Sequence, residues 1–307
     1  MRFLVVRLSA IGDCVMAAHA VSSLRRAHPK ADIVWAVQEK CAPVVASPGL
    51  ADEVIVVPRE RWKQGRRSPA AWFDQVRFYL GMRSREFDVG FDFQGHSKSA
   101  LLARFARCKE VRANRATDAL ARTLLRPVPL PEGIVHEVEK GFALVEPWSL
   151  NDGLGPIMPA VTEGREERLV TIQTGAGEAR KAYPSAQWAE VGRALASKGF
   201  RVVYLGAPGD PEPEGAESLV GRLSLLESTS WVARSALHIA ADTGTGHVAA
   251  AYGTPVVSVF GPTDPDRFRP YGTAVRIVRA ETPGEVPPAE IVAEAESLAG
   301  SLSARPR

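Results

Sequence analysis

The chain has 307 residues, of which 45% are hydrophobic and 24% charged, the balance of an ordinary globular protein and not of a disordered one. At roughly 150 residues per domain, this length predicts two domains. No stretch approaches the about 18 consecutive apolar residues of a membrane-spanning helix. The three cysteines, Cys14, Cys41 and Cys108, are too far apart for a zinc site or a disulfide framework, which favours a reduced, cytoplasmic protein.

Charge is distributed unevenly along the chain. Residues 1–150 contain 23 Lys and Arg against 16 Asp and Glu, whereas residues 151–307 contain 15 against 19. A basic first half predicts that this half meets an anionic partner. Nucleic acid, an anionic lipid and a phosphorylated sugar all fit the charge alone, and so does an ordinary solvated basic surface.

The first half alternates apolar runs with segments of helical spacing, a pattern typical of a parallel sheet covered on both faces by helices. Between them lies the basic stretch Arg59–Arg85, whose beginning is expected to form a loop over the edge of the sheet. The expected strands are Phe3–Leu8, Ile33–Val37, Val54–Val57 and Asp88–Phe93, and the expected helices are Cys14–Ala27 and the segment from Gly95 to Phe105.

Prolines and glycines between Arg126 and Glu167 predict the junction of two domains, residues 1–150 and 151–307, although His136–Val145 within it has helical spacing. The alternation then restarts, so the sequence predicts two doubly wound α/β domains in tandem. A closing helix over residues 288–301 is expected to pack back toward the first domain. The strands expected in the second half are Leu169–Gln173, Arg201–Leu205, Ile239–Ala241 and Val256–Phe260, and the helices are Ser185–Ser197, Gly215–Gly221, Ser230–Leu237 and Thr245–Tyr252.

Ligands of doubly wound sheets bind at the carboxyl ends of the strands, so the loops that follow the strands are the candidate sites. These loops contain no GxGxxG, GxxxxGK[ST] or GxSxG motif, which argues against a dinucleotide-binding domain, a P-loop phosphotransferase and an α/β-hydrolase. The run Asp-Thr-Gly-Thr-Gly-His at 242–247 stands where a strand gives way to a helix. Backbone amides exposed there predict an anion site, with His247 facing the loop. A tight turn capped by Asp242 or Thr243, with His247 in the core, fits the same residues.

Two further loops carry charged residues at such positions. The run Gln-Thr-Gly-Ala-Gly at 173–177, followed by Lys181, suits a diphosphate approached from the other side. Asp13 stands at the turn after the first strand. It can cap the following helix, or it can accept a proton from a substrate hydroxyl.

Five motifs in this order resemble glycosyltransferase family 9, in particular its lipopolysaccharide heptosyltransferases of the heptosyltransferase I branch. They are Leu-Ser-Ala-Ile-Gly-Asp at 8–13, Phe-Gln-Gly-His-Ser-Lys-Ser at 93–99, Lys-Ala-Tyr-Pro at 181–184, Asp-Thr-Gly-Thr-Gly-His at 242–247 and Phe-Gly-Pro-Thr-Asp-Pro at 260–265. The family usually has Trp where this chain has Tyr183, and its acceptor segment does not align cleanly through Cys108–Arg122.

The resemblance implies the α/β, GT-B type of fold, with two Rossmann-like doubly wound domains facing across a cleft. The first domain would bind the acceptor and the second the nucleotide sugar. It implies an inverting transfer of heptose from ADP-heptose to the inner core (Kdo-lipid A) of lipopolysaccharide, with no obligatory metal or other cofactor. The expected partners are an ADP-sugar donor and an anionic glycolipid acceptor, with no nucleic acid. The expected location is the cytoplasm, peripherally on the inner face of the cytoplasmic membrane.

The resemblance also implies roles for single residues. Asp13 matches the proposed general base. The residues that would meet the acceptor's anionic groups are Arg59, Arg61 and Lys98. The residues that would bind the donor are Thr174, Gly175, Lys181, Asp210, Leu223, Asp242, Thr243, Gly244 and His247, of which Asp210 would contact the ribose and Leu223 the adenine.

Other functions remain open at the level of sequence. A family 9 enzyme with another nucleotide sugar or acceptor has the same motifs. A GT-B-like nucleotide-sugar isomerase would need additional acid and base groups, and a phosphorylase would need a cofactor lysine or a second phosphate site. A non-catalytic protein that only binds the donor would be favoured by loss of the first-loop aspartate, and Asp13 is present.

Overall fold

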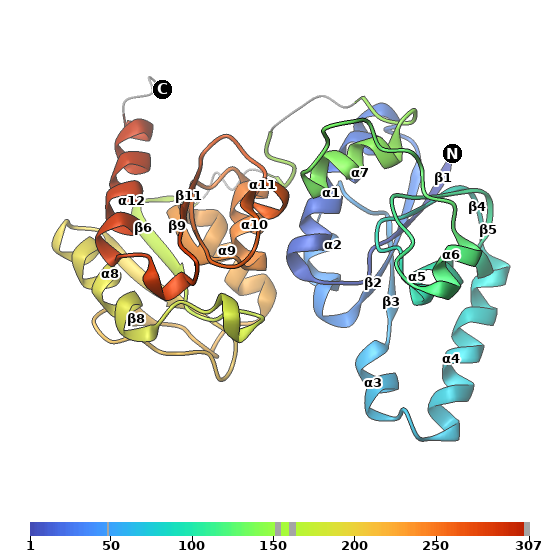
Figure 1. Ribbon diagram of the computed structural model, residues 1–307, viewed down its shortest axis with the longest axis horizontal. Coiled ribbons are helices and arrows are strands. Elements are labelled where there is room, and N and C mark those ends of the chain that lie inside the picture. The colour runs from blue at the N-terminus through green and yellow to red at the C-terminus, as the bar shows by residue number, and fades with distance from the viewer. Residues whose placement is uncertain (48, 151–154, 160–163, 304–307) are drawn as a thin grey trace. The chain divides into compact units, whose positions relative to one another are not determined.

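The computed structural model describes residues 1–47, 49–150, 155–159 and 164–303, apart from the side chains of 301–303. The chain divides into two compact units, Met1–Gly153 and Leu154–Arg307, each with its own parallel sheet (Figure 1). The sequence places the boundary between residues 150 and 151, next to residues 151–154, which lie outside the described part.

The first unit is built on a five-stranded parallel sheet with the strand order β3-β2-β1-β4-β5. Its strands are β1 (Arg2–Val6), β2 (Asp32–Gln38), β3 (Glu53–Val57), β4 (Glu86–Asp92) and β5 (Arg107–Ala113). Its α-helices are α1 (Ile11–Ala27), α2 (Ala42–Val45), α3 (Arg59–Gln64), α4 (Pro69–Gly81), α5 (Ser97–Phe105), α6 (Ala119–Leu124) and α7 (Glu137–Val145), with short 3-10 helices at Glu39–Cys41 and Met82–Ser84.

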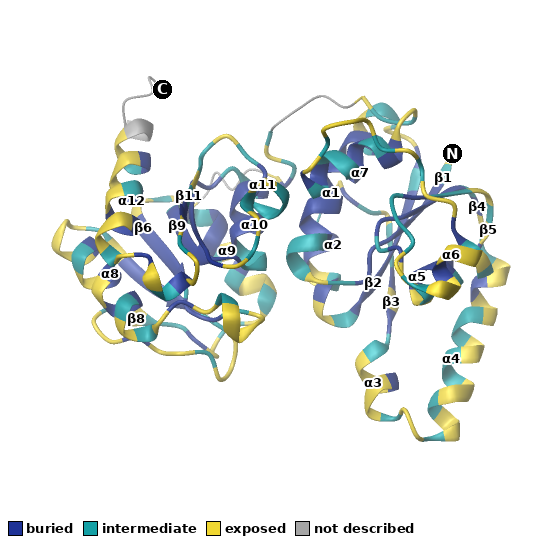
Figure 2. Ribbon diagram, in the orientation of Figure 1, coloured by how far each residue is buried: buried dark blue, intermediate teal, exposed yellow. Residues whose placement is uncertain are grey.

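Both faces of this sheet are buried, which is why its central strands are continuous apolar runs. Leu4 and Val6 pack in one core cluster with Leu102 of α5. Phe3 alternates with them and faces the other way, where its ring lies 5.6 Å from that of His28 at the end of α1. The residues of β1 itself are almost wholly buried (Figure 2).

Several elements of this unit differ from the sequence expectation. The stretch expected to begin as a loop after Pro58 forms α3 and α4, because Trp62 is buried against Phe78 of α4, with ring centroids 5.3 Å apart. Helix α1 begins at Ile11 and not at Cys14. Strand β5 is not evident in the sequence, because an edge strand is partly exposed and can carry charged residues.

The second unit has a six-stranded parallel sheet with the order β11-β10-β9-β6-β7-β8. Its strands are β6 (Glu166–Gln173), β7 (Arg201–Leu205), β8 (Glu217–Ser218), β9 (Ser235–Ala241), β10 (Val256–Phe260) and β11 (Val275–Arg279). Its α-helices are α8 (Ser185–Ser197), α9 (Leu225–Arg234), α10 (Gly244–Tyr252), α11 (Pro265–Phe268) and α12 (Pro288–Ser303), with 3-10 helices at Ala179–Lys181 and Pro283–Glu285.

Two sequence expectations for this unit are wrong. The stretch 215–221 is not a helix: Gly215 and Gly221 have φ of 94° and 69°, which are not helical values, and β8 lies between them. Residues 235–237 belong to β9 and not to a helix, because Leu237 pairs in register with Val170 of β6. Helix α9 accordingly lies earlier in the chain, where Ser224 and Glu227 form a capping box.

The closing helix α12 packs against α8 and against strands β9, β10 and β11 of its own unit. Ile291, Ala295 and Leu298 of α12 join the core cluster that contains Trp188 of α8. Within the described residues, no helix is both long and apolar enough to cross a membrane.

Candidate active site

Each sheet has one position at which the strand order reverses. In the first unit, β1 pairs with β4, and in the second unit, β6 pairs with β9. Because the two strands of each pair are parallel neighbours, their carboxyl ends lie side by side. The loops that follow them therefore begin next to each other. Ligands of open α/β sheets bind at this position. We call the two places the β1–β4 site and the β6–β9 site.

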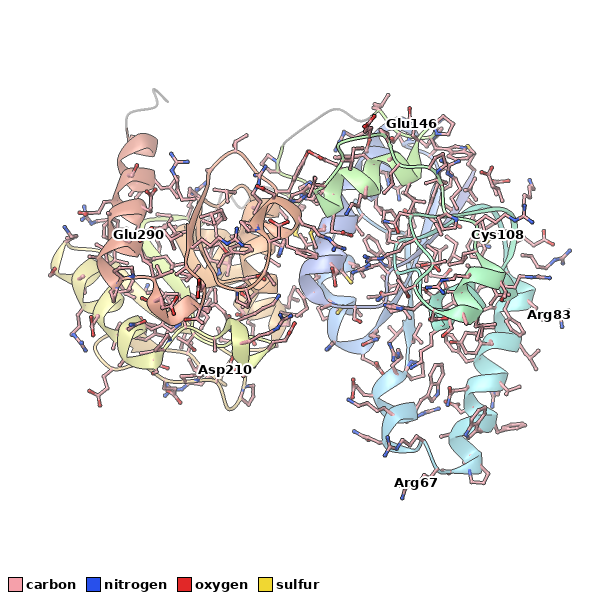
Figure 3. All side chains as sticks on the ribbon, viewed as in Figure 1. Arg67, Arg83, Cys108, Glu146, Asp210 and Glu290 are labelled. Carbon is pink, nitrogen blue, oxygen red and sulfur yellow. The ribbon has the colours of Figure 1, made fainter. Side chains whose placement is uncertain are left out.

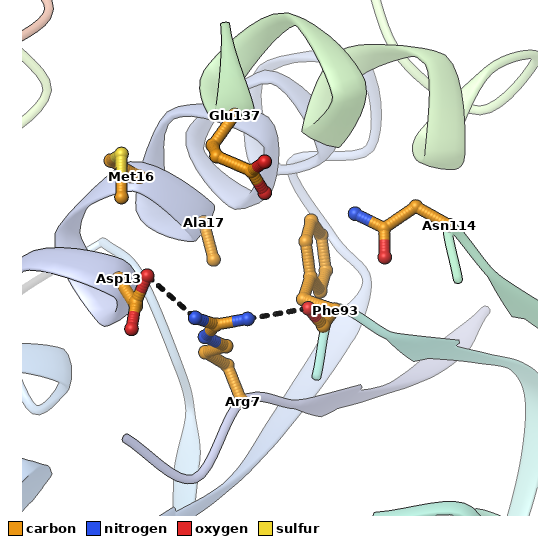
Figure 4. Close-up of a pocket in the computed structure, with 7 residues that line it drawn as sticks. All are labelled: Arg7, Asp13, Met16, Ala17, Phe93, Asn114 and Glu137. Atoms are coloured by element: carbon orange, nitrogen blue, oxygen red, sulfur yellow. Dashed lines mark hydrogen bonds and ion pairs between the residues drawn. The ribbon is translucent and has the colours of Figure 1, made fainter. Parts of the chain in front are cut away.

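The β1–β4 site is organised around the buried guanidinium of Arg7. Its Nη2 lies 2.6 Å from Asp13 Oδ1, and its Nη1 donates to the carbonyl oxygen of Phe93 at 2.6 Å (Figure 4). Asp13 is the third residue of α1, and its Oδ2 accepts from the backbone N–H of Ala10 at 2.9 Å. The carboxylate is thus held from two sides while about a third of the side chain stays exposed. Asp13 therefore both caps α1 and faces solvent.

A small cavity of about 10 Å³ lies beside this ion pair, enough for about one water molecule. It is lined by Arg7, Asp13, Met16, Ala17, Phe93, Asn114 and Glu137 (Figure 4). Glu137 is the first residue of α7, and its carboxylate lies 3.0 Å from the ammonium of Lys140 and 3.6 Å from Arg115 Nη1. The cavity wall is therefore polar and carries both signs of charge.

A second carboxylate, Asp92, lies beneath this loop pair at the end of β4 and is fully buried. Burial raises the pKa of Asp92 to about 6, although the amides of Gln94 and Gly95 and the Arg7 guanidinium act in the opposite direction. Asp92 Oδ1 accepts from both amides at 2.8 Å, so it fixes the turn that leads into α5. Sequence reasoning missed both Arg7 and Asp92. The signal was available, since each is a charged residue at the end of an apolar run.

The predicted acceptor residues separate into two groups. Burial lowers the pKa of Lys98 on α5, and the charge of Arg59, at the start of α3, acts in the same direction, so the two cations lie near enough to interact. Burial raises the pKa of Tyr79, whose hydroxyl donates to the Lys98 carbonyl oxygen, and Arg59 opposes that rise. Arg61 is elsewhere: it pairs with Asp74 of α4, which also accepts from Trp62 Nε1.

In the β6–β9 site, the central contact joins Lys181 and Asp242. The Lys181 ammonium lies 2.7 Å from Asp242 Oδ2, and the same oxygen accepts from the Thr263 hydroxyl at 2.7 Å. Lys181 lies in the 3-10 helix after the Gly-rich loop of β6, and Asp242 follows β9 directly. The two loops singled out in the sequence are therefore in contact, and Thr263 after β10 is an addition to them.

Helix α10 starts at Gly244, two residues after Asp242, with Thr243 as its N-cap. The Thr243 hydroxyl lies 3.2 Å from that of Thr245, and within the described chain its side chain makes no capping hydrogen bond to the helix. The first-turn amides, which begin at Gly244, therefore present the partial positive charge of the helix N-terminus to an anion. His247 lies one turn into the helix and is buried.

A buried chain of hydroxyls supports this turn from below. His238 of β9 lies with Nδ1 2.9 Å from the Thr171 hydroxyl and with Nε2 3.0 Å from the Thr245 hydroxyl. Burial lowers the pKa of His238 to about 3, so the imidazole is neutral at physiological pH and can donate on one side and accept on the other. His238 was not identified from the sequence, because it stands within an apolar run and the local sequence does not indicate its hydrogen-bond partners.

The remaining predicted donor residues lie on the same edge of the sheet. Thr174 is buried, and its hydroxyl donates to the carbonyl oxygen of Pro211 at 2.7 Å, so it ties two loops together. Asp210 accepts from the amide of Ala207 at 2.7 Å, and its carboxylate is so close to Gly175 that a Cβ there would collide with it. Leu223 is half-buried just before α9. The structure thus gives Thr174 and Asp210 structural contacts, and their roles toward a donor stay predictions.

Across the described residues, no group of three or more His, Cys, Asp and Glu side chains is placed to hold a metal ion. The cationic groups of the two sites come from the chain itself, with Arg7, Arg59 and Lys98 in the first unit and Lys181 in the second.

Two Rossmann-like units in one chain, each with polar loops where its strand order reverses, make up an α/β fold of the GT-B type. The structure entitled "E. coli heptosyltransferase WaaC with ADP" shares this fold, with a TM-score of 0.84, 24% identity and coverage of 97% of this chain and all of that one. Residues 76–295 match the family "Glycosyltransferase family 9 (heptosyltransferase)". The chain belongs to glycosyltransferase family 9, which confirms the assignment made from its motifs.

Individual relatives agree with this result. The chain is 28% identical over 291 residues to "Lipopolysaccharide heptosyltransferase 1" of Pseudomonas aeruginosa, an alignment that covers 89% of this chain and 82% of that protein. The structure entitled "E. coli heptosyltransferase WaaC with ADP-2-deoxy-2-fluoro heptose" has a TM-score of 0.82 and 25% identity, and the match covers 97% of this chain and 99% of that one. The family match begins at residue 76, so Asp13 and Arg59 lie outside it, and their roles stay predictions.

The buried carboxylate Asp92 makes stability depend on pH. Its pKa of about 6 in the folded chain exceeds the unfolded value of about 3.9, so the folded state binds more protons in between, and stability falls as pH rises through that window. Asp92→Asn keeps an oxygen for the Gln94 and Gly95 amides and removes the titration. We expect the stability of the variant relative to wild type to increase by about 3 kcal/mol, at most, from pH 4 to pH 7.

Urea unfolding at pH 4, 5, 6 and 7 measures this difference. Asp32→Asn is the matched control, because Asp32 is an accessible carboxylate paired with Arg2 at 2.7 Å. A stability difference between Asp92→Asn and wild type that stays constant across this range would contradict the assignment.

Proposed function

We propose that this glycosyltransferase transfers heptose from ADP-heptose to the Kdo-lipid A inner core of lipopolysaccharide, with inversion at the anomeric carbon. Family membership and the names of the relatives support the sugar and the acceptor. The observation that carries the proposal is the division of charged groups between the units. The first offers an accessible carboxylate held by Arg7, and the second offers a lysine beside the N-terminus of α10.

In this proposal Asp13 is the general base. Inverting transfer needs a group that removes the proton of the attacking hydroxyl while its oxygen bonds to the anomeric carbon and the bond to the diphosphate breaks. Asp13 has the accessibility for this task, and its contacts with Arg7 and the Ala10 amide fix its orientation. Well-oriented groups need little reorganisation during the reaction.

The β6–β9 site stabilises the departing ADP. The Lys181 ammonium has three donors, so it can keep Asp242 and still reach a phosphate oxygen. The amides of the first turn of α10, with Thr243, Gly244 and His247, would meet the rest of the diphosphate charge. Thr174 and Gly175 would border the phosphates, while Asp210 and Leu223 would contact the ribose and the adenine. Because these groups supply positive charge, we propose that no metal is obligatory.

The pair Arg59 and Lys98 binds anionic groups of the glycolipid acceptor. Two neighbouring cations repel, and an anion that binds beside both relieves that repulsion. Kdo-lipid A carries phosphate and carboxylate groups of this kind, and guanidinium pairs with both in a two-pronged geometry. The enzyme would then work in the cytoplasm, peripherally on the inner face of the cytoplasmic membrane, with no nucleic acid as partner.

A donor panel tests the proposal. ADP-heptose, ADP-glucose, UDP-sugars and GDP-sugars are compared for nucleotide release with Kdo-lipid A as acceptor, with and without EDTA. We expect release from ADP-heptose, unaffected by EDTA, and at least about tenfold weaker ADP binding in Lys181→Ala, because a charge-assisted contact is lost. Lys198→Ala is the control, since Lys198 pairs with Glu296 on a surface away from the loops. Turnover of a UDP- or GDP-sugar in preference to ADP-heptose would refute the donor assignment.

Asp13→Asn tests the base. We expect turnover to fall by about 10²-fold or more, the scale of a lost general base, while ADP binding stays unchanged. Asp32→Asn again serves as control, because Asp32 begins β2 and so lies at the amino ends of the strands, away from the loops that follow their carboxyl ends. If Asp13→Asn retained more than half of the turnover at saturating substrate, Asp13 would be only a helix cap.

Arg59 and Arg61 form a matched pair for the acceptor site. Arg59→Ala and Lys98→Ala are expected to raise the KM for the acceptor by about tenfold and to reduce its dependence on salt. Arg61→Ala should change it less, because Arg61 is already paired with Asp74. Acceptor kinetics at two salt concentrations make the comparison. Equal effects of Arg59→Ala and Arg61→Ala would mean that helix α3 acts only through its total charge.

A further inference from the structure

Helix α4 presents an apolar face that is not covered by the other described elements of the first unit. Every residue of this helix is exposed or half-buried, in contrast to the buried α1 (Figure 2). Its most exposed large side chains are Trp72 at 64%, Phe73 at 72%, Val76 at 49% and Leu80 at 48%. At 100° per residue these four fall within about 100° of the helix circumference, so they form one face. We call it the α4 apolar face.

Other side chains of α4 attach it to the first unit. Phe78 and Asp74 contact Trp62 of α3, and Tyr79 reaches α5 through the carbonyl oxygen of Lys98. Asp74 and Phe78 therefore form the side of α4 that faces the first unit, Tyr79 lies at the margin, and the α4 apolar face stays exposed in the described structure. Helices α3 and α4 together project from the sheet of the first unit (Figure 1). Because α3 and α4 project from the sheet, the α4 apolar face is accessible to a binding partner.

Exposed arginines surround the α4 apolar face. Arg66 and Arg67 lie in the connection between α3 and α4, Arg77 lies within the helix, and Arg83 follows it. Arg67 and Arg83 lie near opposite ends of the projection (Figure 3). From Arg59 to Arg85 the chain contains eight Lys and Arg against two Asp and Glu. One of those two acids, Asp74, is engaged by Arg61.

We propose that the α4 apolar face docks on an anionic lipid bilayer, with the aromatic side chains in the interface and the arginines on lipid phosphates. Tryptophan, phenylalanine and leucine on one side of a helix, with basic residues around them, are the features of helices that lie in a membrane interface. The net positive charge selects an anionic lipid surface over a second copy of this chain, which would bring two basic segments together.

The docking surface also carries part of the proposed acceptor site. Arg59 begins α3, and Tyr79 of α4 contacts Lys98, so docking by α4 brings the Arg59 and Lys98 pair to the membrane together with it. The inference rests on the proposed function in one respect, since a lipid-anchored acceptor has to be met at a membrane. Vesicles without the acceptor test the surface separately from the reaction, and ADP release on detergent-dispersed acceptor tests the reaction separately from the surface.

The experiment is vesicle sedimentation of the full chain with phosphatidylglycerol–phosphatidylethanolamine or pure phosphatidylcholine vesicles. We expect wild type to partition at least about tenfold better to the anionic vesicles, and Trp72→Ser/Phe73→Ser and Arg66→Glu/Arg67→Glu each to lose about tenfold. The matched controls are Leu226→Ser, an exposed leucine of the second unit, and Lys30→Glu/Arg126→Glu, which changes the charge equally. Both controls should stay within about twofold of wild type. Unchanged far-UV circular dichroism and an unchanged urea unfolding midpoint show that each variant is folded.

Trp72→Phe adds a spectroscopic readout. Trp72 is the exposed member of the chain's six tryptophans, all of which lie in the described residues. Anionic vesicles should shift the tryptophan emission of wild type to the blue, and Trp72→Phe should lose that shift while it still binds. Equal partition of wild type and Trp72→Ser/Phe73→Ser would overturn the proposal. A wild-type dimer that this double substitution dissociates, without vesicle binding, would overturn it in favour of a second copy.

Discussion

The parallel pairing of β1 with β4 and of β6 with β9 is the constraint on which the rest of the molecule depends. A parallel sheet directs all of its strand ends to one edge, and a reversal of strand order leaves adjacent loops that diverge and can admit a ligand. Both units have this reversal, and both have an ion pair there, Arg7 with Asp13 and Lys181 with Asp242. Arg7 reaches Phe93, and Lys181 reaches Asp242, because those strands are neighbours. Candidate site residues far apart in the chain thus meet because backbone hydrogen bonds pair the strands that precede them.

The two sites handle buried charge in different ways. In the β1–β4 site a buried guanidinium is stabilised by Asp13, a backbone carbonyl oxygen and the nearby Asp92, since an isolated charge in the interior would be costly. In the β6–β9 site the support below the loop is neutral: His238 stays uncharged between two hydroxyls. Because the neutral His238 does not offset the positive charge of Lys181 and of the α10 N-terminus, that charge stays available to the proposed diphosphate. In the first unit, by contrast, the charged Arg7 orients the carboxylate of Asp13.

Exposure also divides the first unit by role. Its sheet and α1 are buried, as stability requires. Helix α4 instead leaves large aromatic side chains in solvent, and a stretch of chain that exposes so much apolar area usually has a binding role. The position of Arg59 at the start of α3 links that surface to the proposed acceptor residues. The excess of basic residues in the first half does not by itself identify a partner. The structure shows that part of this excess surrounds the exposed helix α4.

The sequence by itself determined the tandem α/β organisation, the family and most buried strands, because continuous apolar runs and short motifs are local properties of the chain. It also located the loops of Asp13, Lys181 and Asp242. Only the tertiary structure decided that Lys181 touches Asp242 and that Arg59 lies near Lys98 while Arg61 pairs with Asp74. It also placed Arg7 and Asp92 at the β1–β4 site. Edge strand β5 and helices α3 and α4 were likewise decided by partners distant in sequence, such as Trp62 and Phe78. The local pattern of apolar residues indicates which segments are buried. Contacts between loops depend on the order of the strands in the sheet, which the local sequence does not specify.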